Sequence, residues 1–452
     1  MRRPPYVVPS RHDLVVATAT RAIGGPVGRY AAIGTRGLGA VAAALIALGT
    51  VMLALGVFQK GHCVAKGWSN PSQFWRACYS DLPVVHVTSD LADRSLPYAG
   101  AGSDQPLGSG LVMWLVSLVT PQAGTDVGAQ RWVFLTWAAL AVLLLAAGVL
   151  AGIALLPQDP WHLAHLALSP VLVVLALIST DLVGIALVLW GWWAWTRGHP
   201  VLAGSLMGLA FLIRPYPLVF LLAIALVAWR EDRVRAAATA LVSAALAALA
   251  LYLPALFLVG EGILAAPRGW FSAGPGYGAL ALLPQSFGFT LLTPVPTMVA
   301  LLGWLAALLV GAWLTFRSLA RPDAVQVAAV MLLIVALSAK SLSVQTGLWL
   351  LPLLALSAVR WRDHLIWAAT DIVHFEATWL HIGFSSDAGK GLPGETYALA
   401  ILLRMAGWAW VVWQIWQSPT RKAPEPSTAP EAEPQPAQAR ARELPMVDRP
   451  TG

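Results

Sequence analysis

The chain has 452 residues, of which 58% are hydrophobic and only 11% are charged. Apolar runs recur from about residue 38 to residue 416 and cannot all be packed into a soluble core. The composition therefore excludes an ordinary soluble protein and indicates an all-α polytopic membrane protein. The net charge of +7 comes mostly from arginines in short loops. It favours contact with anionic membrane lipids and argues against nucleic acid as a partner.

The first apolar run, near 38–58, follows a polar leader that contains several arginines. A leader of about 37 residues is too long for a standard signal peptide, and Leu53-Ala54-Leu55 leads into no obvious cleavage site. We therefore interpret the run as a membrane helix that is kept in the mature protein. Residues 1–37 are predicted to form a cytoplasmic N-terminal segment.

The distribution of arginines orients the predicted helices, because short loops rich in Arg or Lys face the cytoplasm. Arginine-rich stretches occur at 197–199, 230–235, 317–321 and 360–362. Placing them inside, with the N-terminus, predicts roughly 12 crossings. The crossings lie near 38–58, 131–156, 161–177, 179–195, 200–213, 216–229, 237–259, 298–316, 324–339, 345–359, 364–382 and 396–416. Both termini are then cytoplasmic in a multi-pass protein of the cell membrane.

Two of these runs, 200–213 and 216–229, are short. About 14 residues of helix span ~21 Å, which is less than a ~30 Å hydrocarbon core. They are either half-spans or a hairpin whose tip is the stretch "RPYP" at 214–217. The apolar stretch 107–120 must lie along the membrane interface or re-enter the membrane if the map holds.

The map leaves segments 59–130, 260–297 and 383–395 outside the membrane. The first of them contains Cys63 and Cys78, the two cysteines of the chain. These are either two unrelated small residues or a disulfide, and two cysteines in one exported loop favour the disulfide.

The C-terminal residues 419–452 are rich in Pro, Ala and Glu and contain little that could be buried. We expect a disordered cytoplasmic tail. Residues 38–418 are then the membrane domain, with 59–130 as its first outside loop.

Ionisable and amide side chains gather at the outside end of the predicted helices. Charged residues at membrane ends or at membrane depth are energetically expensive and by default suggest function. Both signs of charge are present, and the group comprises Asp81, Asp90, Asp93, Arg94, Asp104, Asp181, Arg214, Lys340, Gln345 and His381.

Several of these residues have a structural alternative. Asp181 follows a serine and a threonine at a predicted helix start, so it could be an N-cap. Lys340 could anchor a helix end by extending its ammonium to the membrane surface. Asp371 and His374 are not part of this group but fall inside an apolar run. They share one face of a predicted helix, and a polar contact between helices explains them as well as a site does.

The outside group suits sugar transfer from a lipid phosphate, which composition alone does not single out. A carboxylate can act as general base on an acceptor hydroxyl, and cations at the membrane boundary can hold a phosphate. The chain contains no glycine-rich phosphate loop, which argues against a soluble nucleotide-sugar enzyme. It also shows no His/Cys spacing typical of a metal site, although carboxylates could still hold a divalent ion.

Four blocks of sequence carry a family resemblance. They are "CYSDLP" at 78–83 followed by "LADRSLPY" at 91–98, the stretch from "STDL" at 179–182 to "RPYP" at 214–217, "KSLSVQTGLWLLPLLAL" at 340–356, and "TDIVHFEATW" at 370–379. The chain resembles the GT-C superfamily of polyprenol-phosphate-sugar glycosyltransferases. Within it, the chain is most similar to the actinobacterial polyprenol-phosphate-mannose-dependent α-mannosyltransferases of glycosyltransferase family 87.

The resemblance implies a GT-C-type helical bundle of roughly 11–13 helices and a set of roles. Asp81 matches the proposed catalytic base of the family, and Asp104 is a second acid that orients it or binds sugar hydroxyls. Arg214 and Lys340 would bind the lipid phosphate, and Asp181 and Gln345 would contact the sugar.

Three further residues complete the implied site, because Tyr79 and His86 would neighbour Asp81 and Tyr216 would line the substrate site. A Cys63–Cys78 bridge would hold Asp81 near the membrane surface. The implied partners are a polyprenyl-phosphate-linked sugar donor, a glycolipid or glycan acceptor and membrane lipids. No cofactor and no metal are implied.

Several positions depart from the family pattern. Asp104 and Gln105 stand where the family usually has Glu-Tyr, and Ser179-Thr180 replace Asn-Trp. Arg214 replaces a lysine, which keeps phosphate binding but changes its geometry. Val344 and Thr346 replace proline and tyrosine. These replacements leave the donor sugar and the acceptor open, and polyprenyl-phosphate-arabinose is an alternative donor.

Two other classes of protein use similar residues. A transporter or flippase of a lipid-linked sugar needs the same cations but no base, and it often shows internal repeats with interrupted helices. No convincing repeat is present, and a large polar outside loop suits an enzyme better. A membrane protein that has lost catalysis is the other alternative, because of the replacements around Asp104 and Ser179.

Overall fold

The computed structural model describes residues 35–100, 104–319 and 321–418, and within these ranges the chain forms helices and no strand. The fold is therefore all-α, as the hydropathy pattern predicts. The predictions for the leader before residue 35 and for the tail 419–452 lie outside the described residues.

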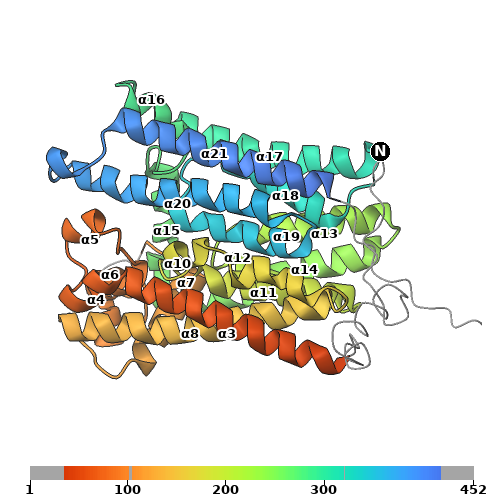
Figure 1. The fold of residues 1–452 in the computed structure, drawn as a ribbon, viewed down its shortest axis with the longest axis horizontal. Coiled ribbons are helices and arrows are strands. Elements are labelled where there is room, and N and C mark those ends of the chain that lie inside the picture. The colour runs from red at the N-terminus through yellow and green to blue at the C-terminus, as the bar shows by residue number, and fades with distance from the viewer. Residues whose placement is uncertain (1–34, 101–103, 320, 419–452) are drawn as a thin grey trace, which may run out of the picture.

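Six long helices form the frame of the bundle and lie roughly parallel to one another (Figure 1). They are α3 (Thr35–Gln59), α8 (Val127–Leu155), α14 (Val234–Val259), α17 (Pro294–Arg317), α20 (Trp361–Phe384) and α21 (Gly394–Gln417). Among the described residues, five helical stretches are long and apolar enough to cross a membrane. These are Gly37–Gln59, Val127–Leu155, Val234–Ser272, Pro294–Arg317 and Ala388–Gln417.

Shorter apolar helices fill the space between the long ones. They are α7 (Leu107–Val119), α11 (Asp181–Thr196), α12 (Pro200–Phe211), α13 (Pro217–Arg230) and α18 (Ala324–Ser338). The two short runs near 200–213 and 216–229 are thus separate helices, and the stretch between them carries Arg214. The stretch 107–120 consists of α7, which has 13 residues, and its C-cap Thr120.

The outer surface of the bundle is apolar, as a protein in contact with lipid requires. Helices α14 and α17 expose leucines and phenylalanines along their length, including Leu246, Phe257, Leu302 and Leu309. Helical backbone satisfies its own hydrogen bonds, so these segments can face hydrocarbon without unpaired polar groups.

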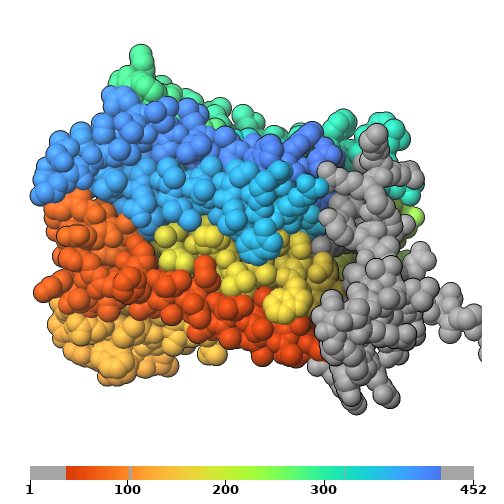
Figure 2. Space-filling view, in the orientation of Figure 1, coloured from red at the N-terminus to blue at the C-terminus, as the bar shows by residue number. Residues whose placement is uncertain are grey.

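Two predicted crossings, near 161–177 and 345–359, are broken rather than continuous helices. The first consists of η2 (Pro160–Leu163), α9 (Ala164–Ala167) and α10 (Val171–Leu175), and the second of η5 (Val344–Leu350) and α19 (Leu351–Leu356). Pro170 precedes α10 and Pro352 lies in the first turn of α19. Proline has no N–H to donate, and its ring crowds the preceding turn, so it favours the start of a helix over its interior. Both segments are buried, and α10 lies between α3 and α20 (Figure 2).

The remaining short elements belong to three connections. The first, between α3 and α7, contains α4 (Gly61–Lys66), α5 (Ser72–Trp75), α6 (Asp81–Thr88) and η1 (Asp90–Asp93). The second, between α14 and α17, contains η3 (Gly260–Leu264), α15 (Ala265–Ser272), η4 (Leu280–Leu282) and α16 (Leu283–Ser286). A short η6 (Ala388–Lys390) joins α20 to α21.

Helices α4, α5 and α6 lie together at one end of the bundle, near the connection between α20 and α21 (Figure 1). We call this the site end. The indole Nε1 of Trp75 in α5 donates to the Gly383 carbonyl of α20, 3.3 Å away. A disulfide joins Cys63 of α4 to Cys78, three residues before Asp81, and both cysteines are fully buried.

Removing this disulfide is expected to destabilise the site end. It closes a loop of 15 residues, for which the chain-entropy model predicts a contribution of about 3 kcal/mol. The double substitution Cys63→Ser and Cys78→Ser should therefore lower the thermal midpoint of the detergent-purified protein. An unchanged midpoint would show that packing alone holds this segment.

Candidate functional site

The start of α6 places Asp81 against a segment that is about a hundred positions later in the chain. The Asp81 backbone N–H donates to the Ile178 carbonyl at 2.7 Å. The preceding residue, Ser80, is fully buried, and its hydroxyl donates to the Leu177 carbonyl at 2.8 Å. Because 177–178 lead directly into the start of α11, the two bonds bring Asp81 next to Asp181.

A second tie brings Arg214 to the same place. The Ser109 hydroxyl of α7 is buried and donates to the Ile213 carbonyl at 3.1 Å. The same Ser109 oxygen accepts a hydrogen bond of 2.9 Å from the Thr180 hydroxyl. One serine therefore connects the residue before Arg214 to the residue before Asp181.

Arg214 lies between the two carboxylates. Its Nε donates to Asp181 Oδ2 at 3.3 Å, and its Nη2 is 4.0 Å from Asp81 Oδ2. Asp181 also accepts from the Trp349 indole Nε1 at 2.6 Å and from the Ser179 hydroxyl. The Asp181 side chain is 1% exposed, whereas Arg214 and Asp81 keep 18% and 13%. Asp181 is thus enclosed and positions Arg214, and Asp81 and Arg214 are the groups that solvent or a ligand can reach.

The electrostatic surroundings of Asp81 suit a base that works near neutral pH. Burial raises the pKa of the Asp81 carboxyl to about 6, and Arg214 and a hydrogen bond from Tyr79 act in the opposite direction. The negative charges of Asp181 and Asp104 raise it further. A carboxylate with this pKa is ionised at pH 7 and still basic enough to accept a proton from a hydroxyl.

Tyr79 lies beside Asp81 and belongs to an aromatic group at the site end. Burial, together with the Asp81 charge, raises the pKa of the Tyr79 hydroxyl, so it stays protonated and can donate to the carboxylate. The ring packs against Phe74 and Trp379, with centroids 5.8 Å and 4.8 Å away. Asp104 is exposed and close enough to affect Asp81 electrostatically.

Tyr216 and Gln345 lie around the segment that carries Trp349. The Tyr216 hydroxyl is 3.3 Å from the Thr346 hydroxyl, and its ring centroid is 5.7 Å from that of Trp349. Gln345 is buried in η5, one residue before Thr346. The structure therefore brings both predicted residues to the segment that holds Asp181.

His86 and Lys340 lie elsewhere. The His86 ring Nε2 is 3.1 Å from the Gly124 carbonyl. The Lys340 ammonium is 2% exposed and donates to the Trp270 carbonyl at 2.6 Å and to the Thr297 hydroxyl at 2.8 Å. Lys340 therefore does not extend to the surface, and it ties the end of α15 to α17. For both residues a role in substrate binding stays a prediction.

The sequence analysis missed Lys60, which follows α3 directly. Its side chain is fully buried, and the ammonium donates to the Tyr79 carbonyl at 2.9 Å. Burial lowers the pKa of Lys60 to about 7, while the charges of Asp81 and Glu376 act to raise it. A lysine at the end of an apolar run looks like an ordinary membrane anchor, so only the fold reveals that it lies close to Asp81.

Asp81, Arg214 and Asp181 define a polar centre in a membrane protein, which consists of an accessible carboxylate, an accessible guanidinium and an enclosed carboxylate. Within the described ranges, no group of three or more His, Cys, Asp or Glu side chains is arranged to hold a metal ion. A carboxylate that can accept a proton, next to a cation that can bind phosphate, is suited to group transfer from a phosphorylated substrate.

Comparison with known proteins identifies the family. The model of glycosyltransferase family 87 matches residues 106–339, more than half of the chain. The chain belongs to glycosyltransferase family 87 and is a membrane glycosyltransferase, as the sequence motifs predict. The curated proteins and the solved structures gave no match. The matched range contains Asp181 and Arg214, whereas Asp81, Lys60 and Trp349 lie outside it.

Proposed function

We propose that this protein transfers a sugar, mannose, from a polyprenyl-phosphate donor to a hydroxyl of a glycolipid or glycan, with inversion of the anomeric carbon. The observation that supports it best is the placement of Arg214 with Nη2 4.0 Å from the Asp81 carboxylate. The contact places a base and a phosphate-binding cation in one accessible centre, and a bound donor would separate them, because the acceptor and the leaving phosphate lie on opposite faces of the sugar in an inverting displacement.

In the proposed reaction the Asp81 carboxylate accepts the proton of the acceptor hydroxyl. The acceptor oxygen forms a bond to the anomeric carbon of the sugar, and the bond from that carbon to the phosphate oxygen breaks. The transition state resembles an oxocarbenium ion, as in inverting glycosidases. The products are the glycosylated acceptor, protonated Asp81 and a polyprenyl monophosphate.

Arg214 would bind the phosphate and stabilise the charge that develops as it leaves. Asp181 keeps the guanidinium oriented through Nε, which leaves the Nη groups for the phosphate and for Asp81. A preorganised cation costs no reorganisation during the reaction and is therefore an effective stabiliser. Asp104, which is exposed, would bind sugar hydroxyls or orient the acceptor.

The choice of mannose and of a polyprenyl carrier rests on the sequence resemblance. The orientation rests on the arginine-rich loops, which place both termini in the cytoplasm and the site end outside the cell membrane. In this orientation the membrane lipids hold the donor's polyprenyl chain, and the acceptor approaches from the extracytoplasmic side.

The test is transfer of label from polyprenyl-phosphate-[¹⁴C]mannose into glycolipid and glycan, with the purified protein in liposomes that contain extracts of the acceptor lipids. Label in the acceptor fraction supports the proposal. If label is transferred only from polyprenyl-phosphate-arabinose, the donor sugar is arabinose and not mannose. No transfer from either donor would overturn the proposed reaction.

The pH dependence of transfer should report the titration of Asp81. A base is active in its ionised form, so kcat/KM should rise as pH increases through about 6, the pKa of Asp81, and level off above it. An ordinary aspartate would place this limb near pH 4. The variant Asp104→Asn removes a charge that raises the pKa of Asp81, so its limb should move to lower pH. A limb near pH 4 in the wild-type profile would contradict the assignment of Asp81 as the base.

A further inference from the structure

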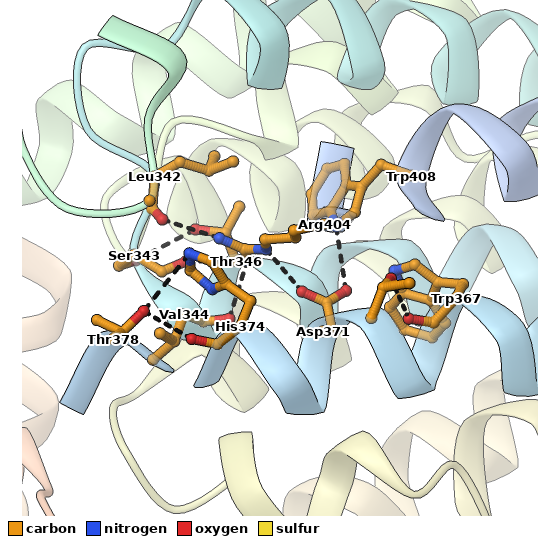
Figure 3. Close-up of polar contacts among 12 residues, drawn as sticks. Leu342, Ser343, Val344, Thr346, Trp367, Asp371, His374, Thr378, Arg404 and Trp408 are labelled. Carbon is orange, nitrogen blue, oxygen red and sulfur yellow. Dashed lines mark hydrogen bonds and ion pairs between the residues drawn. The ribbon is translucent and has the colours of Figure 1, made fainter. Parts of the chain in front are cut away.

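A buried ion pair joins α20 to α21 in the interior of the bundle (Figure 3). The Arg404 Nε donates to Asp371 Oδ1 at 2.7 Å, and the two side chains are 0% and 1% exposed. The indole Nε1 of Trp408 donates to the other carboxylate oxygen, Oδ2, at 3.0 Å. Asp371 therefore makes a polar contact between helices, which is the structural alternative that its position in the sequence suggested.

The other two nitrogens of the Arg404 guanidinium donate to the backbone of residues 342–344. Its Nη1 donates to the Leu342 carbonyl at 2.9 Å, and its Nη2 donates to the Ser343 and Val344 carbonyls at 3.2 Å and 3.1 Å (Figure 3). Leu342 and Ser343 lie in the irregular stretch between the end of α18 and the start of η5, and Val344 is the first residue of η5. The Ser343 carbonyl also accepts from the Thr346 N–H at 3.1 Å. Irregular backbone inside a membrane protein is stable only when the surrounding protein supplies such partners.

This irregular segment leads directly to the residues that hold the site. Thr346 contacts the Tyr216 hydroxyl at 3.3 Å, and Trp349 donates to Asp181 at 2.6 Å. Asp181 in turn binds Arg214. Gly347, between the two, runs so close to the ion pair that a Cβ there would lie 3.0 Å from Asp371 Oδ2. A continuous series of contacts therefore connects Arg404 to the cation of the site.

Residues 276–278 bind the same segment as well. The Gly276 N–H donates to the Lys340 carbonyl at 2.8 Å, and the Leu342 N–H donates to the Tyr277 carbonyl at 3.1 Å. At Gly278, where φ is +77°, a Cβ would lie 2.1 Å from the Leu342 carbonyl oxygen. A Cβ at Gly278 would also lie 3.2 Å from Arg404 Nη1. Arg404 and residues 276–278 thus bind the same segment next to each other, so a shift of one contact displaces the others.

We propose that Arg404 is a positioning residue for sugar transfer, which holds residues 342–344 so that Trp349 and Asp181 orient Arg214 toward the phosphate of the donor. The proposal rests on the proposed function. It uses the fork geometry of arginine, because a lysine at 404 could keep the charge next to Asp371 but could not reach three carbonyls at once.

The contacts favour positioning over a simple connection between helices. An ion pair that only joins α20 and α21 needs the bond to Asp371 and no more. Three of the four acceptors of Arg404 are instead backbone carbonyls of one irregular segment. Trp408 provides a matched comparison, because it binds the same Asp371 carboxylate from the same helix and makes no contact with residues 342–344 among the bonds shown in Figure 3.

A double-mutant cycle on the full-length protein in liposomes tests the proposal. The variants are Arg404→Lys, Trp349→Phe and the two combined, with Trp408→Phe as control. Each single variant of the cycle should lower kcat/KM for the polyprenyl-phosphate donor by about tenfold, mainly through KM. Residues that act in one series of contacts are not additive. The combined variant should therefore also lose about tenfold, instead of about a hundredfold, and Trp408→Phe should stay within about twofold of wild type.

The outcomes separate the proposal from the proposed function. Additive losses in the cycle, or an equal loss in Trp408→Phe, would overturn the positioning role while transfer by the wild type still supports the reaction. If the wild type transfers no sugar, the proposed function fails, and the same cycle is measured as binding of polyprenyl monophosphate to the purified variants. Non-additive losses of binding would then support the positioning of Arg214, and unchanged or additive binding would overturn it. The thermal midpoint of each variant shows that the protein is folded.

Discussion

Replacing Asp81 by asparagine is expected to lower the rate of sugar transfer by about 10²–10⁴-fold, the usual contribution of a general base. Asparagine has nearly the same shape, and the Asp81 backbone N–H would still donate to the Ile178 carbonyl. The amide cannot accept the acceptor's proton, however, so kcat should fall while the KM for the donor changes little.

The matched control is Asp93→Asn, because Asp93 is an exposed carboxylate in the same connection, outside the centre formed with Arg214. It should transfer sugar at the rate of the wild type. Asp104→Asn should give an intermediate loss, since Asp104 is exposed and acts on Asp81 through its charge. Transfer by a folded Asp81→Asn protein at the wild-type rate would show that another group is the base.

Replacing Arg214 by glutamine is expected to lower kcat/KM by about 10²–10³-fold, as the loss of one preorganised stabilising donor does in other enzymes. The glutamine leaves the enclosed carboxylate of Asp181 without its cation. The KM for the donor should rise, because Arg214 would bind the phosphate in the ground state. The kcat should fall, because the phosphate becomes more charged in the transition state.

Arg214→Gln should also shift the pH profile. Arg214 lowers the pKa of Asp81 against the effect of burial, so its removal should move the acidic limb of kcat/KM to higher pH. Arg214→Lys should keep the limb closer to its original position, since the charge remains, but should not restore the full rate, because one ammonium cannot bind Asp181 and the phosphate with the same geometry. A control is Arg268→Gln, which removes an exposed arginine paired with Glu261. Equal losses in Arg214→Gln and Arg268→Gln would contradict a specific role for Arg214.

The membrane class, the all-α fold and most of the long helices could be predicted from the sequence. Hydropathy is a local property, so a run such as 131–156 or 298–316 identifies its own helix without knowledge of its neighbours. The match between the short runs and α12 and α13 has the same origin. The family could also be predicted, because the motifs around Asp181 and Arg214 are contiguous stretches of sequence.

The two predicted crossings that are broken in the structure could not be recognised as broken from their local sequence. Apolar composition around Pro170 and Pro352 looks like that of a spanning helix, but these segments are enclosed by other helices, which can accommodate an interrupted backbone. Whether a segment faces lipid or protein depends on its neighbours in space, and hydropathy alone does not contain that information.

By itself, the sequence determined that this protein is a membrane glycosyltransferase with polar residues at one end of its helices. Only the tertiary structure decided which of those residues are buried, which are accessible and which contact one another. Asp181 is enclosed by Trp349, Lys60 faces Asp81, and Arg404 holds a segment about sixty positions away in the chain. Each of these relations joins distant positions, and the role of a charged side chain depends on its partners and its burial, which exist only once the chain is folded.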